Sequence, residues 1–576
     1  MVFEHKLLEH LEVIYDRETA ETLLTRIKDL IERYQFHVGN NQEEHYAWSE
    51  EDAILITYGD VISQNGQNDH KIRLLVDFLT QYVHGAINSV HILPFFPSSS
   101  DHGFSVIDYR EVRDDLGEWS DVERLAENYL VMADLVINHT SRSSEWFKNY
   151  QLGKEPGKDY FIELDPSASV ELSKVIRPRS SPLFISVETG NGLRHVWTTF
   201  SDDQIDLDFS NPEVLVEFVD IFLLYLSKGI RLIRLDAIAY LWKEIGTTSI
   251  HLEKTHHVVK LFRDIIDYVR PHGTLITETN VPFEENVSYF GQGDEAHMVY
   301  QFSLPPLLLH ALLTENSQYL TGWAMNLPEP PEGCTYFNFT ASHDGIGVRP
   351  LEGLVPEDEF NYLVESTKER GGFVSYKTNA DKTQSPYELN ITYFDAFAEP
   401  GQKETDLQMK RYLCSQTIMI SLQGVPGIYF HSLVATENYI AGVLENGEKR
   451  SINRRQWDYK ELKERLEDEA SPTRIVLDYF KNILNIRKEH AAFSPEARQK
   501  VLDLGHEIFA FIRIAADIDE EILVLSNMTN KEIELPHAQL DSFTEEKEVR
   551  DLLSRASRRI DPQLTLDPFE TVWLIR

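Results

Sequence analysis

Three carboxylates, Asp236, Glu278 and Asp344, each follow an apolar segment with the composition of a buried β-strand. The carboxyl ends of parallel strands are where a (β/α)₈ barrel keeps its catalytic groups. Two such carboxylates can cleave a glycosidic bond with retention, one as nucleophile and one as acid/base, when they lie about 5–5.5 Å apart. A third can hold sugar hydroxyls and stabilise the oxocarbenium-like transition state. The pattern therefore predicts glycoside chemistry.

The first of these segments is residues 229–240, GIRLIRLDAIAY, an apolar run that a glycine opens. Because side chains alternate along a strand, Arg234 and Asp236 are expected on the same side. An arginine and an aspartate that project together suit a catalytic strand end. A buried structural ion pair is the alternative, and this segment alone does not decide between them.

The elements that must position these side chains form an α/β pattern. Strands are predicted at residues 53–58, 86–96, 130–139, 229–236, 274–278, 298–302, 336–343 and 427–430, with amphipathic helices between them, such as 212–226 and 256–268. We expect a (β/α)₈ TIM barrel with two inserted subdomains, an N-terminal helical extension and a C-terminal antiparallel β-domain. The boundaries are 1–50 for the extension, 51–138, 206–344 and 409–495 for the barrel, 139–205 and 345–408 for the inserts, and 496–576 for the β-domain.

Composition limits the partners and the compartment. The chain has 576 residues, 42% of them hydrophobic, and a net charge of −39. This charge argues against nucleic acid and anionic membranes, because both need basic patches on the protein. The two cysteines, Cys334 and Cys414, cannot form a disulfide framework or a cysteine zinc cluster. With neither a signal peptide nor an apolar run of the ~20 residues that span a membrane, we expect a cytoplasmic monomer or homodimer that acts on small molecules.

Two loops carry residues suited to ligands. Residues 98–109 follow a predicted strand and include Asp101, which could bind sugar hydroxyls, and Phe104, which could face a sugar ring. Residues 177–182, RPRSSP, hold Arg177 and Arg179 in a stiff loop, and guanidinium groups suit phosphate. An ordinary surface loop is the alternative in the first case, and salt bridges to surface carboxylates in the second.

From about residue 50 to the C-terminus the sequence resembles the α-amylase superfamily. The matching motifs, in order, are SDHGFSVIDY (100–109), MADLVINH (132–139), RLDAI (234–238), ITETN (276–280) and ASHDGIG (341–347). The resemblance implies that Asp236 is the nucleophile, Glu278 the acid/base and Asp344 the transition-state stabiliser. It also implies a glucose-binding subsite lined by Asp101, Phe104, His139, Arg234, His343 and Arg454.

Within the superfamily the sequence looks like the sucrose-phosphorylase-related glucoside phosphorylases. The shared segments are RPRSSP (177–182), TSIHLEKTH (248–256) and SPYELNITYFDA (385–396). By this resemblance Arg179 and Tyr387 bind phosphate, and Asn280, Glu388 and Arg177 belong to the phosphate and acceptor region. Sucrose phosphorylases have histidine in place of Asn280 and glutamine in place of Glu388. The whole pattern, including EAHMVYQFSLPPL (295–307), is most similar to the glucosylglycerate phosphorylases.

The resemblance implies reversible phosphorolysis of 2-O-α-D-glucosyl-D-glycerate to α-D-glucose 1-phosphate and D-glycerate by double displacement. Inorganic phosphate is then a co-substrate, and no cofactor or metal ion is expected, even though Asn138 matches a calcium-binding position of many amylases. Phosphorylases of sucrose, sucrose 6-phosphate or glucosylglycerol stay open as alternatives, as do an α-glucoside hydrolase and a non-catalytic scaffold. Arg177, Lys377 and Arg349 are candidates for binding the acceptor carboxylate.

Overall fold

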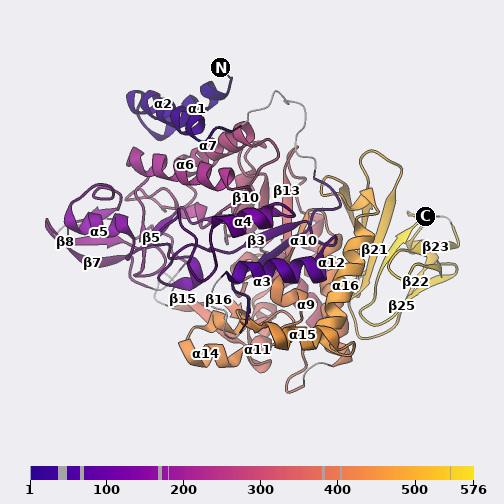
Figure 1. The fold of residues 1–576 in the computed structure, drawn as a ribbon. Coiled ribbons are helices and arrows are strands. Elements are labelled where there is room, and N and C mark those ends of the chain that lie inside the picture. Colours follow the sequence, from indigo (N-terminus) through magenta and orange to yellow (C-terminus); the bar gives the residue numbers. More distant parts are fainter. Residues whose placement is uncertain are drawn as a thin grey trace.

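In the computed structural model, eight parallel strands close into a barrel in the order β1-β17-β13-β12-β11-β10-β4-β3 (Figure 1). The structure describes residues 2–36, 48–64, 70–165, 171–178, 181–378, 383–402, 405–541, 543–544 and 546–576. The barrel strands are β1 (Ile54–Thr57), β3 (Ser89–Ile92), β4 (Leu130–Leu135), β10 (Ile230–Leu235), β11 (Thr274–Thr277), β12 (Met298–Tyr300), β13 (Thr335–Phe339) and β17 (Val425–Tyr429). The predicted (β/α)₈ barrel is confirmed.

Helices cover the barrel, so its strands are buried on both faces and appear in the sequence as apolar runs. The main covering helices are α3 (Lys71–Phe78), α4 (Trp119–Ala126), α6 (Pro212–Ser227), α7 (Glu253–Val269), α9 (Leu304–Thr314), α12 (Asp406–Ser421) and α16 (Pro472–Arg487). The start of α6 follows from local chemistry: Pro212 is its first residue, and the Asn211 side chain accepts from the Glu213 N–H.

Several strands predicted from the sequence are longer than the strands in the structure. The third ends at Leu135 instead of residue 139, because His139 begins a separate strand, β5 (His139–Ser141), that pairs antiparallel with β9 (Gln204–Asp206). The seventh ends at Phe339 instead of residue 343, so Asp344 lies in the loop beyond the strand. The second is confined to Ser89–Ile92, before the two prolines that sequence patterns placed at its end. Apolar character continues past the last ladder hydrogen bond, because these loops are buried as well.

The two inserts lie between barrel elements. The first contains α5 (Glu145–Leu152) and a sheet of β6 (Glu163–Leu164), β8 (Gly192–Trp197) and β7 (Phe184–Thr189). The second, expected to be rich in loops, holds a helix, α11 (Glu357–Glu369), and a sheet of β14 (Ile346–Gly347), β16 (Gln384–Asn390) and β15 (Phe373–Thr378). After β17 come α13 (Phe430–Leu433), α14 (Ile440–Asn446), the 3₁₀ helix Lys449–Asn453 and α15 (Tyr459–Glu467).

An N-terminal helical hairpin, α1 (Val2–Ile14) and α2 (Arg17–Arg33), lies beside α7 and α6 (Figure 1). Phe3 stacks on Tyr268 with ring centroids 3.9 Å apart, and Arg26 pairs with Glu213 at the start of α6. Residues 37–47, the last part of the predicted extension, lie outside the described residues. The hairpin therefore rests on barrel helices through one apolar and one charged contact surface.

The C-terminal region forms a six-stranded antiparallel sheet. Its strands, in order, are β19 (Arg498–Leu502), β20 (Ile508–Ile514), β21 (Glu521–Asn527), β26 (Thr571–Ile575), β23 (Glu548–Asp551) and β24 (Ala556–Arg559), with β22 (Ile533–Pro536) and β25 (Gln563–Leu566) paired beside it. Arg513 of β20 is buried and donates to the carbonyl of Ser421, at the end of α12, at 2.9 Å. This contact joins the sheet to the barrel.

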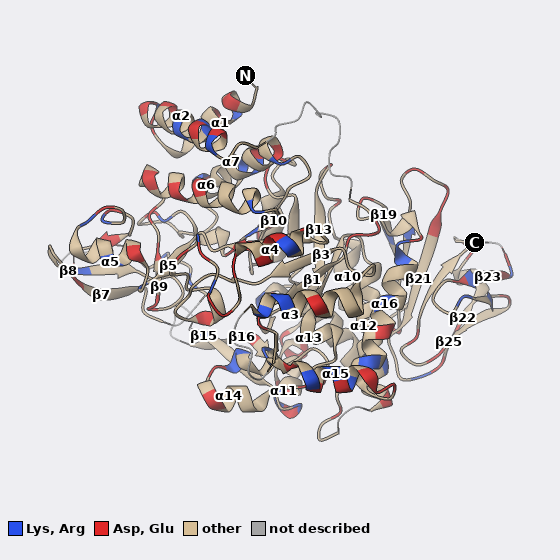
Figure 2. Ribbon diagram, in the orientation of Figure 1, with Lys and Arg blue, Asp and Glu red and all other residues tan. Residues whose placement is uncertain are grey.

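Acidic side chains are spread over the outer helices, with Lys and Arg interspersed (Figure 2). Among the described helices, none is both long and apolar enough to cross a membrane.

Candidate active site

The strands β10 and β11 bring two of the three carboxylates together. Leu235 pairs with Thr277 across the two strands, so Asp236 and Glu278 are the next residues along each. Arg234 Nη1 lies 2.8 Å from Asp236 Oδ1, and its Nη2 lies 3.8 Å from Glu278 Oε2. Ala237 has a left-handed backbone (φ 51°), and its N–H donates to Glu278 Oε2 at 3.1 Å. The strand register therefore places the two carboxylates side by side, next to the guanidinium group of Arg234.

The third carboxylate, Asp344, enters from the loop after β13. Its Oδ1 forms an ion pair with Arg450 Nη1 and lies 3.6 Å from Arg454 Nη2 and 3.5 Å from His343 Nε2. Arg454 is fixed by its own hydrogen bond to the His343 carbonyl, at 2.7 Å. Asp344 therefore lies beside two guanidinium groups and an imidazole.

Aromatic and polar side chains complete the wall of the site. The rings of Phe104 and His343 stack with centroids 4.7 Å apart and planes within 6°. The Gln204 amide nitrogen lies 3.3 Å from Asp101 Oδ2, 3.1 Å from His139 Nε2 and 3.3 Å from the Phe104 carbonyl. Gln204 therefore links the loop after β3 to the strand β5, and it holds three of the predicted sugar-binding residues in place.

The side chain of Arg234 is held in place by a buried aspartate, Asp134. Asp134 on β4 is opposite Arg234 in the barrel register and binds its Nη1, while its other oxygen lies 2.7 Å from His91 Nε2. Burial would raise the pKa of Asp134, but the charge of Arg234 outweighs it and lowers the pKa to about 2. Asp134 is therefore ionised and keeps the guanidinium aimed at Asp236.

The three carboxyl groups differ in their pKa shifts. Burial raises the pKa of Asp236 and of Glu278, since a charged carboxylate loses hydration in the cavity. Arg234 opposes this rise in both, and it lies closer to Asp236 than to Glu278. Burial also acts to raise the pKa of Asp344, but the charges of Arg450, His343 and Arg454 together outweigh it and hold that pKa well below its usual range. Such a set can keep one proton on a buried carboxyl beside ionised neighbours.

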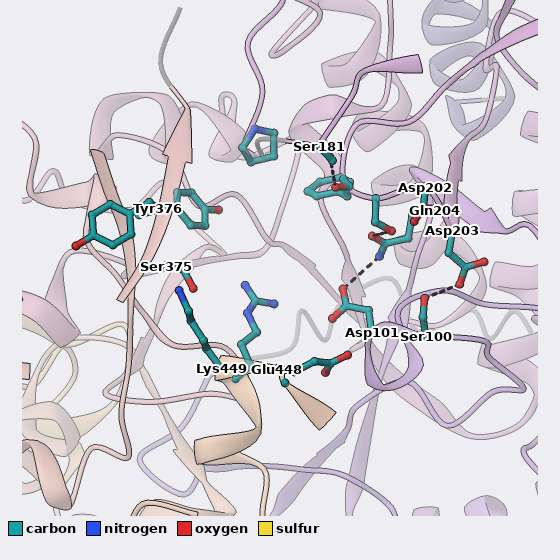
Figure 3. A pocket seen from close by; sticks show the side chains of 16 residues that line it. Ser100, Asp101, Ser181, Asp202, Asp203, Gln204, Ser375, Tyr376, Glu448 and Lys449 are labelled. Carbon is teal, nitrogen blue, oxygen red and sulfur yellow. Dashed lines mark hydrogen bonds between the residues drawn. The ribbon is translucent and has the colours of Figure 1, made fainter. Parts of the chain in front are cut away.

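Two adjacent cavities lie here, and the three carboxylates line the inner one. The inner one is lined by Asp101, Phe104, His139, Phe200, Gln204, Arg234, Asp236, Ala237, Glu278, Asn280, His343, Asp344, Tyr387 and Arg450. The outer one has a volume of about 620 Å³ and shares Asp101, Phe200, Gln204, Tyr387 and Arg450 with the inner one. Figure 3 shows Ser375 and Lys449 on one wall of the outer cavity and Asp101, Ser100 and Asp203 on the other.

The structure brings most of the predicted site residues to the inner cavity. Glu388 and Arg454 lie behind its wall and contact it through Arg450 and Asp344. Arg179, the predicted phosphate ligand, lies outside the described residues. Arg177, Arg349 and Lys377 line neither cavity, and Lys377 pairs with Glu352 at 3.3 Å.

Comparison with known proteins gives the family. The catalytic-domain model of the α-amylases matches residues 78–326. Glucosylglycerate phosphorylase of Spirochaeta thermophila is 44% identical over 92% of this chain and 90% of its own length. Glucosylglycerate phosphorylase of Escherichia coli K12 is 41% identical over 99% of this chain and its full length. The chain belongs to the glucosylglycerate phosphorylase family. A crystal structure of sucrose 6F-phosphate phosphorylase from Thermoanaerobacter thermosaccharolyticum superposes with a TM-score of 0.71 at 26% identity, over 83% of this chain and 94% of that one.

Four residues that line the inner cavity of this member of the glucosylglycerate phosphorylase family were not predicted from sequence motifs: Phe200, Gln204, Ala237 and Arg450. Gln204 lies in the first insert, and Arg450 follows β17 by about twenty residues.

Asn138, which matches a calcium-binding position of many amylases, contacts a buried lysine. The ammonium group of Lys243 lies 2.6 Å from Asn138 Oδ1 and 2.8 Å from Asp206 Oδ2, with the side chain 2% exposed. These oxygens of Asn138 and Asp206 therefore both contact the ammonium group of a lysine of the same chain. Among the described residues, no cluster of three or more His, Cys, Asp or Glu could hold a metal ion.

Proposed function

We propose that this protein catalyses the reversible phosphorolysis of 2-O-α-D-glucosyl-D-glycerate to α-D-glucose 1-phosphate and D-glycerate, with retention of configuration. The observation that carries this is the placement of Asp236, Glu278 and Asp344 around one cavity in a chain of this family. Inorganic phosphate is a co-substrate, and we propose no cofactor and no resident metal ion. We further propose that the protein acts in the cytoplasm as a monomer or homodimer.

In the first step, Asp236 attacks the anomeric carbon while Glu278 protonates the departing oxygen of glycerate. Burial raises the pKa of Asp236, and Arg234, which lies 2.8 Å from its carboxylate, opposes this rise and favours the ionised form that attacks. Glu278 is suited to carry the proton, because burial and the charge of Asp344 raise its pKa. Asp344, kept ionised by Arg450, His343 and Arg454 together, stabilises the positive charge that develops on the sugar ring.

In the second step, phosphate attacks the glucosyl-enzyme while Glu278 is ionised. Two inversions at the same carbon give α-D-glucose 1-phosphate. The phosphate dianion must approach several carboxylates, so its binding needs cations. Arg179 stays a prediction from the sequence for this role, with Tyr387 beside the cavity as its predicted partner.

An acceptor panel with α-D-glucose 1-phosphate as donor tests the substrate. D-glycerate, glycerol, fructose and fructose 6-phosphate are supplied separately, and phosphate release is followed together with the glucoside product. The proposal predicts that D-glycerate gives the highest kcat/KM. A preference for fructose, its phosphate or glycerol would assign the protein to one of the other phosphorylase activities, and release of glucose alone would indicate a hydrolase.

A further inference from the structure

Arg450 is the guanidinium that stands between the two cavities. It lines both the inner cavity, with Asp236 and Glu278, and the outer cavity, with Ser375 and Lys449. Among the described residues of the inner cavity, Arg234 and Arg450 carry a permanent positive charge. Arg234 is committed to Asp134 and Asp236 on the barrel side and does not line the outer cavity. An anion that enters from the outer cavity therefore meets Arg450.

One edge of the Arg450 guanidinium is held by the carboxylate of Glu388. Its Nε lies 3.0 Å from Glu388 Oε1 and its Nη2 lies 2.5 Å from Oε2, so a buried carboxylate holds it in a two-point contact. Gly345 makes room for this contact, since a Cβ there would lie 2.6 Å from Glu388 Cγ.

The other edge of the Arg450 guanidinium, at Nη1, faces the carboxylate of Asp344. Arg450 Nη1 forms an ion pair with Asp344 Oδ1. We infer that Asp344 exchanges Arg450 for the sugar hydroxyls when the glucosyl group is bound, while Arg454 stays beside it at 3.6 Å. This exchange leaves Nη1 of Arg450 without its partner inside a cavity. A buried guanidinium edge without an acceptor is unfavourable, so an incoming oxyanion is bound in place of Asp344.

We propose that Arg450 binds the oxyanion of the acceptor, the carboxylate of glycerate in one direction and phosphate in the other. Glu388 is a positioning residue that holds the guanidinium for this exchange. Binding of the sugar then strengthens binding of the anion, and the reverse, because the bound sugar draws Asp344 away from Arg450. This inference rests on the proposed function and names the residue that selects charged acceptors at the same site.

The test starts from α-D-glucosyl fluoride, which forms the glucosyl-enzyme without phosphate. At fixed concentrations of phosphate, D-glycerate or glycerol, the ratio of transfer product to glucose is measured within each variant, so that a change in overall rate cancels. Arg450→Gln should lower the ratio for phosphate and for D-glycerate by about tenfold or more, while the ratio for neutral glycerol changes less than about threefold. Arg450→Lys, which keeps the charge but loses the fork, should lie between the two.

Lys449→Gln is the matched control, because it removes the same charge from the outer wall, where the ammonium group donates to the Val374 carbonyl at 2.8 Å. A similar loss of both anion ratios in this variant would show that the general field, and not binding by Arg450, is responsible. Equal falls for phosphate, D-glycerate and glycerol in the Arg450 variants, or no change, would also overturn the inference. The parent's own ratios test the proposed function, whereas the change from parent to variant tests Arg450.

Discussion

The carboxylate of Glu278 accepts a hydrogen bond from the backbone N–H of Ala237 at 3.1 Å. Ala237 directly follows Asp236, so the proposed acid/base is tied to the strand end that carries the proposed nucleophile. The left-handed backbone at Ala237 turns this N–H towards Glu278. The spacing of the two carboxylates is therefore fixed by the β10–β11 register and by one backbone contact, and not by side-chain packing alone.

Asp236→Asn should abolish turnover while the protein stays folded. The substitution is nearly isosteric, but the amide cannot form the glucosyl-enzyme, and loss of a nucleophile costs about three orders of magnitude in kcat or more. The measurement is phosphorolysis rate alongside a thermal unfolding curve. Activity within tenfold of the parent would refute the nucleophile assignment.

Glu278→Gln should act differently on two donors. A glucoside with glycerate as leaving group needs the proton from Glu278, so its cleavage should nearly stop. α-D-glucosyl fluoride leaves without protonation, so formation of the glucosyl-enzyme from it should be largely spared. Burst kinetics with both donors distinguish these steps, and an equal loss for the two would show that Glu278 is not the acid.

The pH profile of kcat/KM should show the raised pKa of Glu278. The acid works only while protonated, so activity is present below this pKa and is lost as pH rises through it. Because burial, with the charge of Asp344, raises the pKa, the alkaline loss should lie above the ordinary value of 4.5 for glutamate. The same loss should be absent when glucosyl fluoride is the donor. An identical alkaline limb for both donors would assign it to another group.

Lys243→Ala should destabilise the fold. The change leaves the carboxylate of Asp206 buried without its ammonium partner, and breaking a buried ion pair by removing one partner costs about 3–5 kcal/mol. Calcium should restore part of the loss in the variant and should not raise the Tm of the parent. Lys158→Ala is the control, since its pair with Glu155 is exposed to solvent and contributes little to stability. Equal changes in Tm for the two variants would contradict the role of Lys243.

The sequence predicted the barrel and the three carboxylates because both leave local signals. A buried strand followed by Asp236 or Glu278 is visible as an apolar run that ends in a charge, and the strand order follows from the fold. Strand ends were predicted less well at His139 and Asp344, because the chain stays apolar while it leaves the barrel ladder. Hydropathy does not record where ladder hydrogen bonds stop.

The contacts of Gln204, Lys243 and Arg450 could not be predicted in the same way. Each joins segments far apart in the chain: Gln204 to Asp101, Lys243 to Asn138, and Arg450 to Asp344. A polar or charged residue is usually on the surface, and only the folded chain shows that these three are turned inwards. The same holds for Arg513, whose buried contacts are backbone carbonyls and leave no pattern in the sequence.

The central claim is tested most directly by incubating the purified protein with 2-O-α-D-glucosyl-D-glycerate and inorganic phosphate, and following the reaction by ³¹P and ¹H NMR. The account predicts that phosphate is consumed and that α-D-glucose 1-phosphate and D-glycerate appear in equal amounts, with the anomeric configuration retained from the first detectable product. Free glucose without consumption of phosphate, the β-anomer of glucose 1-phosphate, or no reaction with this glucoside would contradict it.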